Sequence, residues 1–183
     1  ENHPVLLKAE ADRDSYASSK AMGDFYVRIG AQKLGIDALA VRVFNQYGPR
    51  MVGTKYGQVI GEFVKRGLTE PEFTMIGDGS HTRSFCLVTD GARMLVDLFE
   101  RRVTGFINMG NDNEISIFEL AERIHSKLGR EFKPVFLEER PHDHRRRCPD
   151  LTRLRQCLPD LKLTDLDTGL DITIKSFREA MQQ

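Results

Sequence analysis

The chain has 183 residues, enough for one domain with a buried core. Its 27 basic and 27 acidic residues give zero net charge, which argues against a general nucleic-acid or membrane binder. Cys86, Cys148 and Cys157 lack Cys-x-x-Cys spacing, so they indicate reduced thiols of a cytoplasmic protein, not a disulfide framework or a zinc site.

The first predicted element is a helix over residues 16–34, closed by Gly35. Tyr16 and Lys20 are four apart and so share one face of this helix. A free tyrosine has a pKa of about 10 and is a poor base at neutral pH. A lysine cation about 4 Å away favours the phenolate by about 4 kcal/mol, enough to lower that pKa by roughly three units. The spacing fits a proton-transfer pair, although by itself it fits two surface residues better.

Strands and helices alternate in the rest of the chain, which predicts an α/β fold. Two strands flank a glycine turn and fit either a hairpin or a bent segment of sheet. The expected strands are 38–44 (buried on both faces), 73–76, 84–88, 106–109 and 133–137. The first expected helices are 57–66, ending at Gly67, and one capped by Thr89 or Asp90 that runs to about Arg102. The second of these has Met94, Leu95, Leu98 and Phe99 inward. A helix capped by Ser116 and Glu119 and closed by Gly129 follows, and then helices over 150–158 and 164–181.

Several polar residues are candidates for ligand binding. Asn45 follows the first predicted strand, and open α/β sheets bind ligands beyond their C-terminal strand ends. Arg83 precedes strand 84–88, and arginine binds phosphate through a planar fork of donors. The loop 140–147 holds four arginines in eight positions, which also fits a solvated surface loop. Its segment 142–144, His-Asp-His, lacks normal metal-ligand spacing, so we expect no metal.

Several short motifs follow one another along the chain: Tyr16-x-x-x-Lys20, Arg42-x-Phe44-Asn45-x-Tyr47-Gly48-Pro49-Arg50, Arg83-Ser84-Phe85, Phe106-Ile107-Asn108-Met109-Gly110 and Glu139-Arg140-Pro141. In this order they resemble the extended short-chain dehydrogenase/reductase family, and within it the NAD-dependent nucleotide-sugar epimerases, dehydratases and decarboxylases. The resemblance implies the C-terminal part of a Rossmann-type doubly wound sheet in residues 1–67. It also implies that residues 68–183 form mainly a smaller α/β domain that binds the nucleotide sugar.

The resemblance also implies a mechanism. Tyr16 takes a proton from a sugar hydroxyl while hydride passes to NAD, and Lys20 lowers the pKa of Tyr16 and holds the nicotinamide ribose. A transient 4-keto sugar then allows epimerisation, dehydration or decarboxylation. Hydride finally returns to the sugar.

The implied substrate is a UDP- or dTDP-sugar, held by Asn45 and Arg83. In one alignment with the family, Arg140 binds the phosphates and Asp143 the ribose. In relatives that place the phosphate arginine later in the segment, Arg147 binds the phosphates instead. The segment from Phe44 onwards looks slightly closer to UDP-glucuronate decarboxylases and related 4-epimerases, so the reaction stays open.

No glycine fingerprint for NAD stands in this sequence, because Gly77-x-Gly79 lacks a third glycine and a following helix. We therefore expect a C-terminal piece of a longer enzyme, with most of the NAD site upstream of Glu1 and with no turnover or measurable NAD affinity of its own. A cytoplasmic homodimer without nucleic-acid or membrane partners is expected. The alternative is a non-catalytic ligand-binding or dimerisation module that retains the fold.

Overall fold

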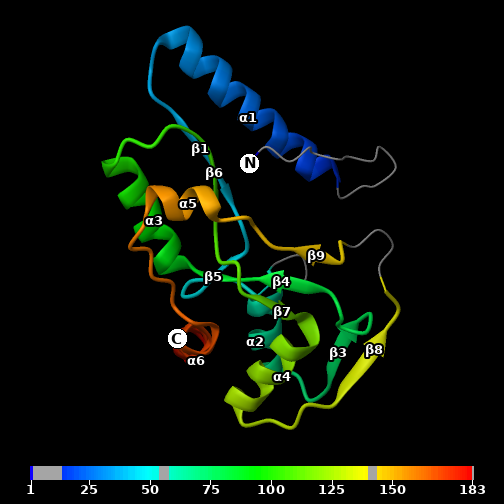
Figure 1. The fold of residues 1–183 in the computed structure, drawn as a ribbon. Coiled ribbons are helices and arrows are strands. Elements are labelled where there is room, and N and C mark those ends of the chain that lie inside the picture. Colours follow the sequence, from blue (N-terminus) through cyan, green and yellow to red (C-terminus); the bar gives the residue numbers. More distant parts are fainter. Residues whose placement is uncertain (2–13, 54–57, 140–143, 183) are drawn as a thin grey trace.

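The computed structural model describes residues 1, 14–53, 58–139 and 144–182 (Figure 1). Its helices are α1 (Asp14–Leu34), α2 (Val59–Thr69), α3 (Val88–Glu100), α4 (Ile117–Leu128), α5 (Thr152–Cys157) and α6 (Leu166–Ala180). Its strands are β1 (Leu39–Val43), β2 (Gln46–Tyr47), β3 (Phe73–Ile76), β4 (Thr82–Ser84), β5 (Cys86–Leu87), β6 (Gly105–Met109), β7 (Glu114–Ser116), β8 (Pro134–Leu137) and β9 (Arg146–Arg147).

Strands β1 and β6 pair in parallel, with Leu39 opposite Gly105 and Val43 opposite Met109. In Figure 1 helix α1 lies on one side of this pair, while α3 and α5 lie on the other. Apolar side chains of α3, β6 and α5 fill the space between them and form what we call the β6 core: Cys86, Met94, Leu98, Ile107, Met109, Leu151, Leu154 and Leu158. Parallel strands joined by helical crossovers are typical of α/β proteins.

A second set of apolar residues, here the α4 core, lies among α2, α4 and α6 (Figure 1). Its buried residues are Tyr47, Ile60, Phe63, Val64, Phe73, Met75, Phe85, Leu87, Ile115, Leu120, Ala121, Ile124, Leu170 and Ile174. Leu39 and Val41 of β1 pack against the β6 core as partly buried residues, so segments on both sides of residue 67 contribute to each core and the two cores interleave along the chain.

Two parallel strand pairs, β3–β8 and β4–β9, follow one another beside the α4 core, and together they are called the broken ribbon. Strand β3 pairs with β8, and further along the same two segments β4 pairs with β9. Strand β7 joins the other edge of β4 in antiparallel register. The turn between β3 and β4 has Gly77 and Gly79 at φ 68° and 74°, a left-handed conformation that glycine adopts without strain.

Local signals placed three helix ends correctly. The Ser116 hydroxyl accepts a hydrogen bond from the Glu119 amide at 3.0 Å, as expected for an N-cap, and Gly129 ends α4 at φ 71°. Gly35 follows α1 at φ 62°.

Other expectations were wrong for reasons of packing. Helix α2 continues through Gly67, because this glycine lets α4 approach: a Cβ there would lie 2.5 Å from Leu128 Cδ1. Strands β3 and β4 form no hairpin, since each pairs with another segment. The strand predicted over 84–88 divides at Phe85, and Val88 already begins α3.

The cap and inner face of α3 also differ from the prediction. Leu87 is the N-cap, and the buried Asp90 lies inside the helix, where its carboxylate accepts hydrogen bonds from the Thr164 amide and from Arg93. Met94 and Leu98 are buried as predicted, whereas Leu95 and Phe99 are 44% and 82% exposed instead of inward. Strand β1 is not buried on both faces, because Val43 is 55% exposed.

Candidate functional site

Tyr16 and Lys20 meet on the first turns of α1, as their spacing predicts. The Lys20 Nζ lies 5.3 Å from the centroid of the Tyr16 ring. Among the described residues, Tyr16 is 69% exposed, so its side chain is accessible to a ligand. A phenol beside an ammonium group can exchange a proton with a bound hydroxyl.

Arg83 and Arg147 stand directly opposite each other in the parallel pair β4–β9. Opposite residues of a pair point to the same face of a sheet, so the two guanidinium side chains share one face. Ile115 of β7 is opposite Arg83 on its other side and is buried in the α4 core. Arg147 is exposed on this face, while Arg83 is partly buried and its Nη1 donates a hydrogen bond of 2.7 Å to the Thr82 carbonyl oxygen.

Asn45 is held beside this pair by β4 itself. Its Nδ2 donates a hydrogen bond of 3.0 Å to the carbonyl oxygen of Ser84, the residue after Arg83. The Asn45 carbonyl in turn accepts from the Cys86 amide at 3.0 Å. These bonds place Asn45 where the chain passes from β4 to β5.

The opposite face of β4–β9 carries an ion pair. Arg146 binds the Glu114 carboxylate with Nε at 2.9 and 3.0 Å and Nη2 at 2.5 Å, and the Thr82 hydroxyl donates to the same carboxylate at 2.8 Å. These charged hydrogen bonds hold the pKa of Glu114 below its usual range, with Arg146 as the main cause. Arg146 is thus engaged in the protein, whereas no ion pair of Arg147 is found among the described residues.

The start of α1 lies near the segment that leads into β9. His144 Nε2 is 4.0 Å from Asp14 Oδ1, and Asp14 lies two residues before Tyr16. The start of α1, which carries Tyr16 and Lys20, therefore lies near the segment that leads to Arg147 (Figure 1).

Two predicted substrate residues, Arg140 and Asp143, lie outside the described residues, as does His142 of the His-Asp-His segment. Within the ranges that the structure describes, no group of three or more His, Cys, Asp or Glu side chains is placed to hold a metal. None of the described helices combines the length and the apolar character that a membrane span requires.

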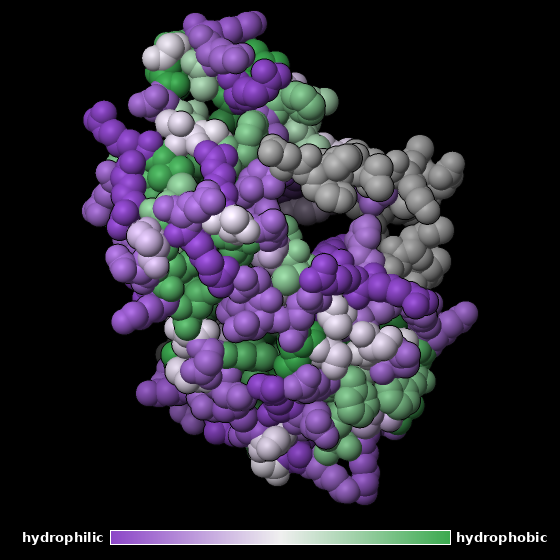
Figure 2. All heavy atoms as spheres, viewed as in Figure 1, coloured by the Kyte–Doolittle hydropathy of each residue, from purple (hydrophilic) through white to green (hydrophobic). Residues whose placement is uncertain are grey.

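Sequence reasoning missed an apolar surface next to the arginines. Ile76 lies opposite Leu137, and Val135 lies on the same face two residues earlier. All three are exposed, at 41%, 49% and 43%. Figure 2 shows hydrophobic residues gathered in this region, beside the strongly hydrophilic residues at β9. The alternation of Val135 and Leu137 in the predicted strand was the available signal.

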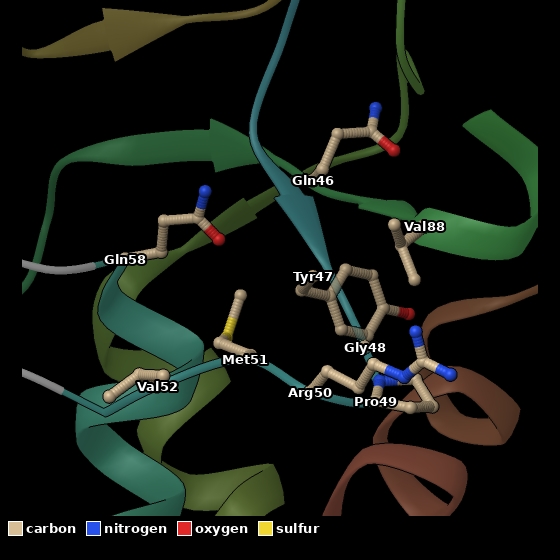
Figure 3. A pocket seen from close by; sticks show the side chains of 9 residues that line it. All are labelled: Gln46, Tyr47, Gly48, Pro49, Arg50, Met51, Val52, Gln58 and Val88. Carbon is tan, nitrogen blue, oxygen red and sulfur yellow. The ribbon is translucent and has the colours of Figure 1, made fainter. Parts of the chain in front are cut away.

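A cavity of about 410 Å³ lies elsewhere, between the start of α2 and the start of α3. In Figure 3 the side chains of Tyr47, Arg50 and Val88 gather at one end, while Gln58 and Val52 lie at the other. None of the predicted site residues lines it.

The residues present fit only part of an NAD site. Tyr16 and Lys20 offer exposed hydrogen-bonding groups that suit a nicotinamide ribose. The glycine turn Gly77–Gly79, however, leads into β4 and not into a helix, so it lacks the helix N-terminus that binds a pyrophosphate.

A family model described as the NAD dependent epimerase/dehydratase family matches residues 3–110. UDP-glucuronic acid decarboxylase 5 of Arabidopsis thaliana is 32% identical over 96% of this chain and 50% of its own length. UDP-N-acetyl-alpha-D-glucosaminuronate decarboxylase of Bacillus cytotoxicus is 33% identical over 91% of this chain and 54% of its own length. The chain spans about half the length of the curated relatives it matches.

Solved structures show the same fold. UDP-N-acetylglucosamine 4-epimerase from Methanobrevibacter ruminantium, in complex with UDP-N-acetylmuramic acid, aligns with a TM-score of 0.85 and 28% identity over 99% of this chain and 60% of that one. UDP-glucuronic acid 4-epimerase from Bacillus cereus, in complex with UDP-glucuronic acid and NAD, aligns with a TM-score of 0.83 and 21% identity over 98% of this chain and 58% of that one. The predicted α/β Rossmann-type fold class is confirmed.

Proposed function

The chain belongs to the NAD dependent epimerase/dehydratase family, and from this premise we propose that it carries the proton-transfer pair and the nucleotide-sugar site of an enzyme that modifies a nucleotide sugar. The observation that carries the proposal is the Tyr16–Lys20 pair, exposed on α1 with Nζ 5.3 Å from the ring centroid. Helix geometry alone brings these two residues together, and the family membership is what gives their meeting a role in proton transfer.

In this proposal Tyr16 accepts the proton of a sugar hydroxyl, and later returns it. The Lys20 ammonium stabilises the tyrosine oxygen as it becomes negative, and it holds the nicotinamide ribose. NAD, when bound, would accept the hydride from the sugar and return it after the 4-keto stage. Most of the NAD site is assigned to protein outside this chain, since the residues present fit only its ribose end.

The substrate is proposed to lie along the broken ribbon. Arg83 and Arg147, adjacent on one face, suit the two phosphates of a nucleoside diphosphate, because guanidinium groups bind phosphate through paired donors. The exposed apolar residues of β3 and β8 lie on the next part of the same ribbon and suit the flat face of a base. The Asn45 side chain, which uses its Nδ2 for the bond to Ser84, is proposed to contact the phosphates or the sugar through its amide oxygen.

Between the two predicted registers for the phosphate arginine, this geometry supports Arg147. Arg147 is paired in register with Arg83, while the neighbouring Arg146 is occupied by Glu114. Arg140 and Asp143 stay predictions.

For the reaction we propose decarboxylation or 4-epimerisation of a UDP-sugar that carries a carboxylate. Support comes from the sequence relatives: the plant and Bacillus cytotoxicus proteins are both named as decarboxylases of UDP-linked uronic acids.

Calorimetric titration of the chain with UDP and with UDP-glucuronic acid tests the substrate half of the proposal. We expect Arg83→Ala and Arg147→Ala each to weaken UDP binding by about tenfold or more, since a hydrogen bond to a charged group is worth about 1.5–3 kcal/mol. Arg178→Ala, on the exposed side of α6, is the matched control and should bind as the parent does. Equal affinity in all variants would contradict the proposal.

NAD titration tests the other half. The chain alone should show no measurable NAD affinity, because it lacks the phosphate-binding glycine loop. Tight NAD binding would overturn that assignment.

One observation favours the second candidate, a module that associates. Helix α1 exposes apolar side chains along its length, including Met22, Phe25 and Tyr26 at 53%, 54% and 72%. We propose that a second copy covers this surface in a homodimer. Sedimentation that shows self-association, together with no UDP binding, would favour this candidate over the enzyme.

A further inference from the structure

We propose that Glu114 is a positioning residue for the nucleotide-sugar site. By binding Arg146 on one face of the β4–β9 pair, it holds Arg147 beside Arg83 on the other face. This inference rests on the proposed function, which assigns the two arginines to the phosphates. Glu114 itself is not placed among the groups that touch the substrate.

Glu114 is well placed for this role because it connects three strands. It lies on β7, opposite Ser84 of β4. Its carboxylate accepts two hydrogen bonds from Arg146 Nε and one from Arg146 Nη2, at 2.5–3.0 Å, and one from the Thr82 hydroxyl at 2.8 Å. A planar guanidinium held at two nitrogens has little freedom to rotate, so the side chain fixes its own strand.

Strand β9 needs such a restraint. It has only two residues, both exposed, and it lies at the edge of its sheet. Its pairing with β4 includes a hydrogen bond from the Thr82 amide to the Arg145 carbonyl at 2.9 Å. So short a strand is only marginally stable by backbone pairing alone.

Arg83 and Arg147 lie directly opposite each other on one face of this strand pair, and the Glu114–Arg146 ion pair lies on the other face. Successive residues of a strand point to opposite faces, so fixing Arg146 on one face fixes the direction of Arg147 on the other.

The inference predicts that Glu114→Gln, which keeps the side-chain shape and removes its charge, weakens UDP binding by about fivefold or more. Its matched control is Glu119→Gln on α4. The Glu119 carboxylate binds Arg123 at a distance of 2.6 Å and is not part of the ribbon. That control should bind UDP as the parent does. Calorimetry with UDP as the probe measures both.

The decisive measurement is a double-mutant cycle with Arg147→Ala. If Glu114 acts through Arg147, Glu114→Gln causes no further loss of UDP affinity once Arg147 is alanine. A charge-swapped protein, Glu114→Arg with Arg146→Glu, should recover affinity relative to Glu114→Gln. Unchanged UDP binding in Glu114→Gln, or a full loss that persists in the Arg147→Ala background, overturns the inference.

Trypsin separates this inference from the proposed function. Glu114→Gln should speed cleavage after Arg145, Arg146 and Arg147, because a released β9 is a better substrate than a paired strand. If the parent chain binds no UDP, the proposed function fails, and the cleavage rate then decides whether Glu114 holds β9. An unchanged rate, with Glu119→Gln as the reference, overturns that restraint.

Discussion

Gly169 of α6 lies against the ring of Tyr47, and we expect Gly169→Ala to destabilise the fold. A Cβ at this position would lie 1.9 Å from the Tyr47 hydroxyl oxygen and 2.7 Å from Cζ. Tyr47 is only 2% exposed, and its ring meets Phe85 edge-on, so it has little space to move. Tyr47 follows Asn45 by two residues, and α6 therefore supports the segment that holds Asn45.

The magnitude is the difference between two opposing effects. Alanine in a helix is favoured over glycine by about 1 kcal/mol. Overpacking a well-filled core costs about 1–3 kcal/mol, and so short a contact belongs at the upper end. The net loss is about 2 kcal/mol, which corresponds to a melting temperature lower by about 4–8 °C in a protein of this size.

Urea and thermal unfolding followed by circular dichroism measure this loss. Gly30→Ala in α1 is the matched control, because a Cβ there meets nothing within 4 Å and should raise stability by up to about 1 kcal/mol. Adding Tyr47→Phe to Gly169→Ala should recover part of the loss, since it removes the closest atom. A Gly169→Ala protein as stable as its parent would refute the reasoning.

Two further predictions follow from buried titratable groups. Burial lowers the pKa of His125, helped by the positive charges of Arg130 and Arg66. Below about pH 6.5 the unfolded chain therefore takes up a proton that the folded chain does not, and the free energy of unfolding should fall between pH 7 and pH 5.5. His125→Phe should reduce this dependence of stability on pH, measured by urea titrations at several pH values. An identical dependence in the variant would contradict the assignment. Burial also raises the pKa of the Cys86 thiol to about 11, so iodoacetamide at pH 8 should label Cys86 at least about tenfold more slowly than Cys157 by mass spectrometry, and equal rates would show that Cys86 is accessible.

The sequence was informative wherever a structure depends on neighbours in the chain. The periodic residues of α1, the glycine after it and the Ser116 cap all act within one or two helical turns, and each was found as predicted. The meeting of Tyr16 and Lys20 belongs to the same class, since a four-residue spacing on a helix fixes it.

Features that depend on distant segments could not be predicted in this way. Arg146 and Arg147 suggested a charged loop, and only their pairing with β4 makes them a strand. For the same reason the sequence left open whether Arg140 or Arg147 serves the phosphates. Periodicity also failed for Phe99, because it shows which residues share a helix face and not whether another element covers that face.

The interleaving of the two cores has a consequence for folding during synthesis. Strand β1 is made well before its partner β6 and the covering helix α5. The α4 core likewise waits for Leu170 and Ile174 of α6. Contacts between segments so far apart in sequence form slowly, and early segments must stay unpaired until then. On the ribosome, the β6 core is therefore complete only once Leu158 has emerged, and the α4 core only once Ile174 of α6 has emerged.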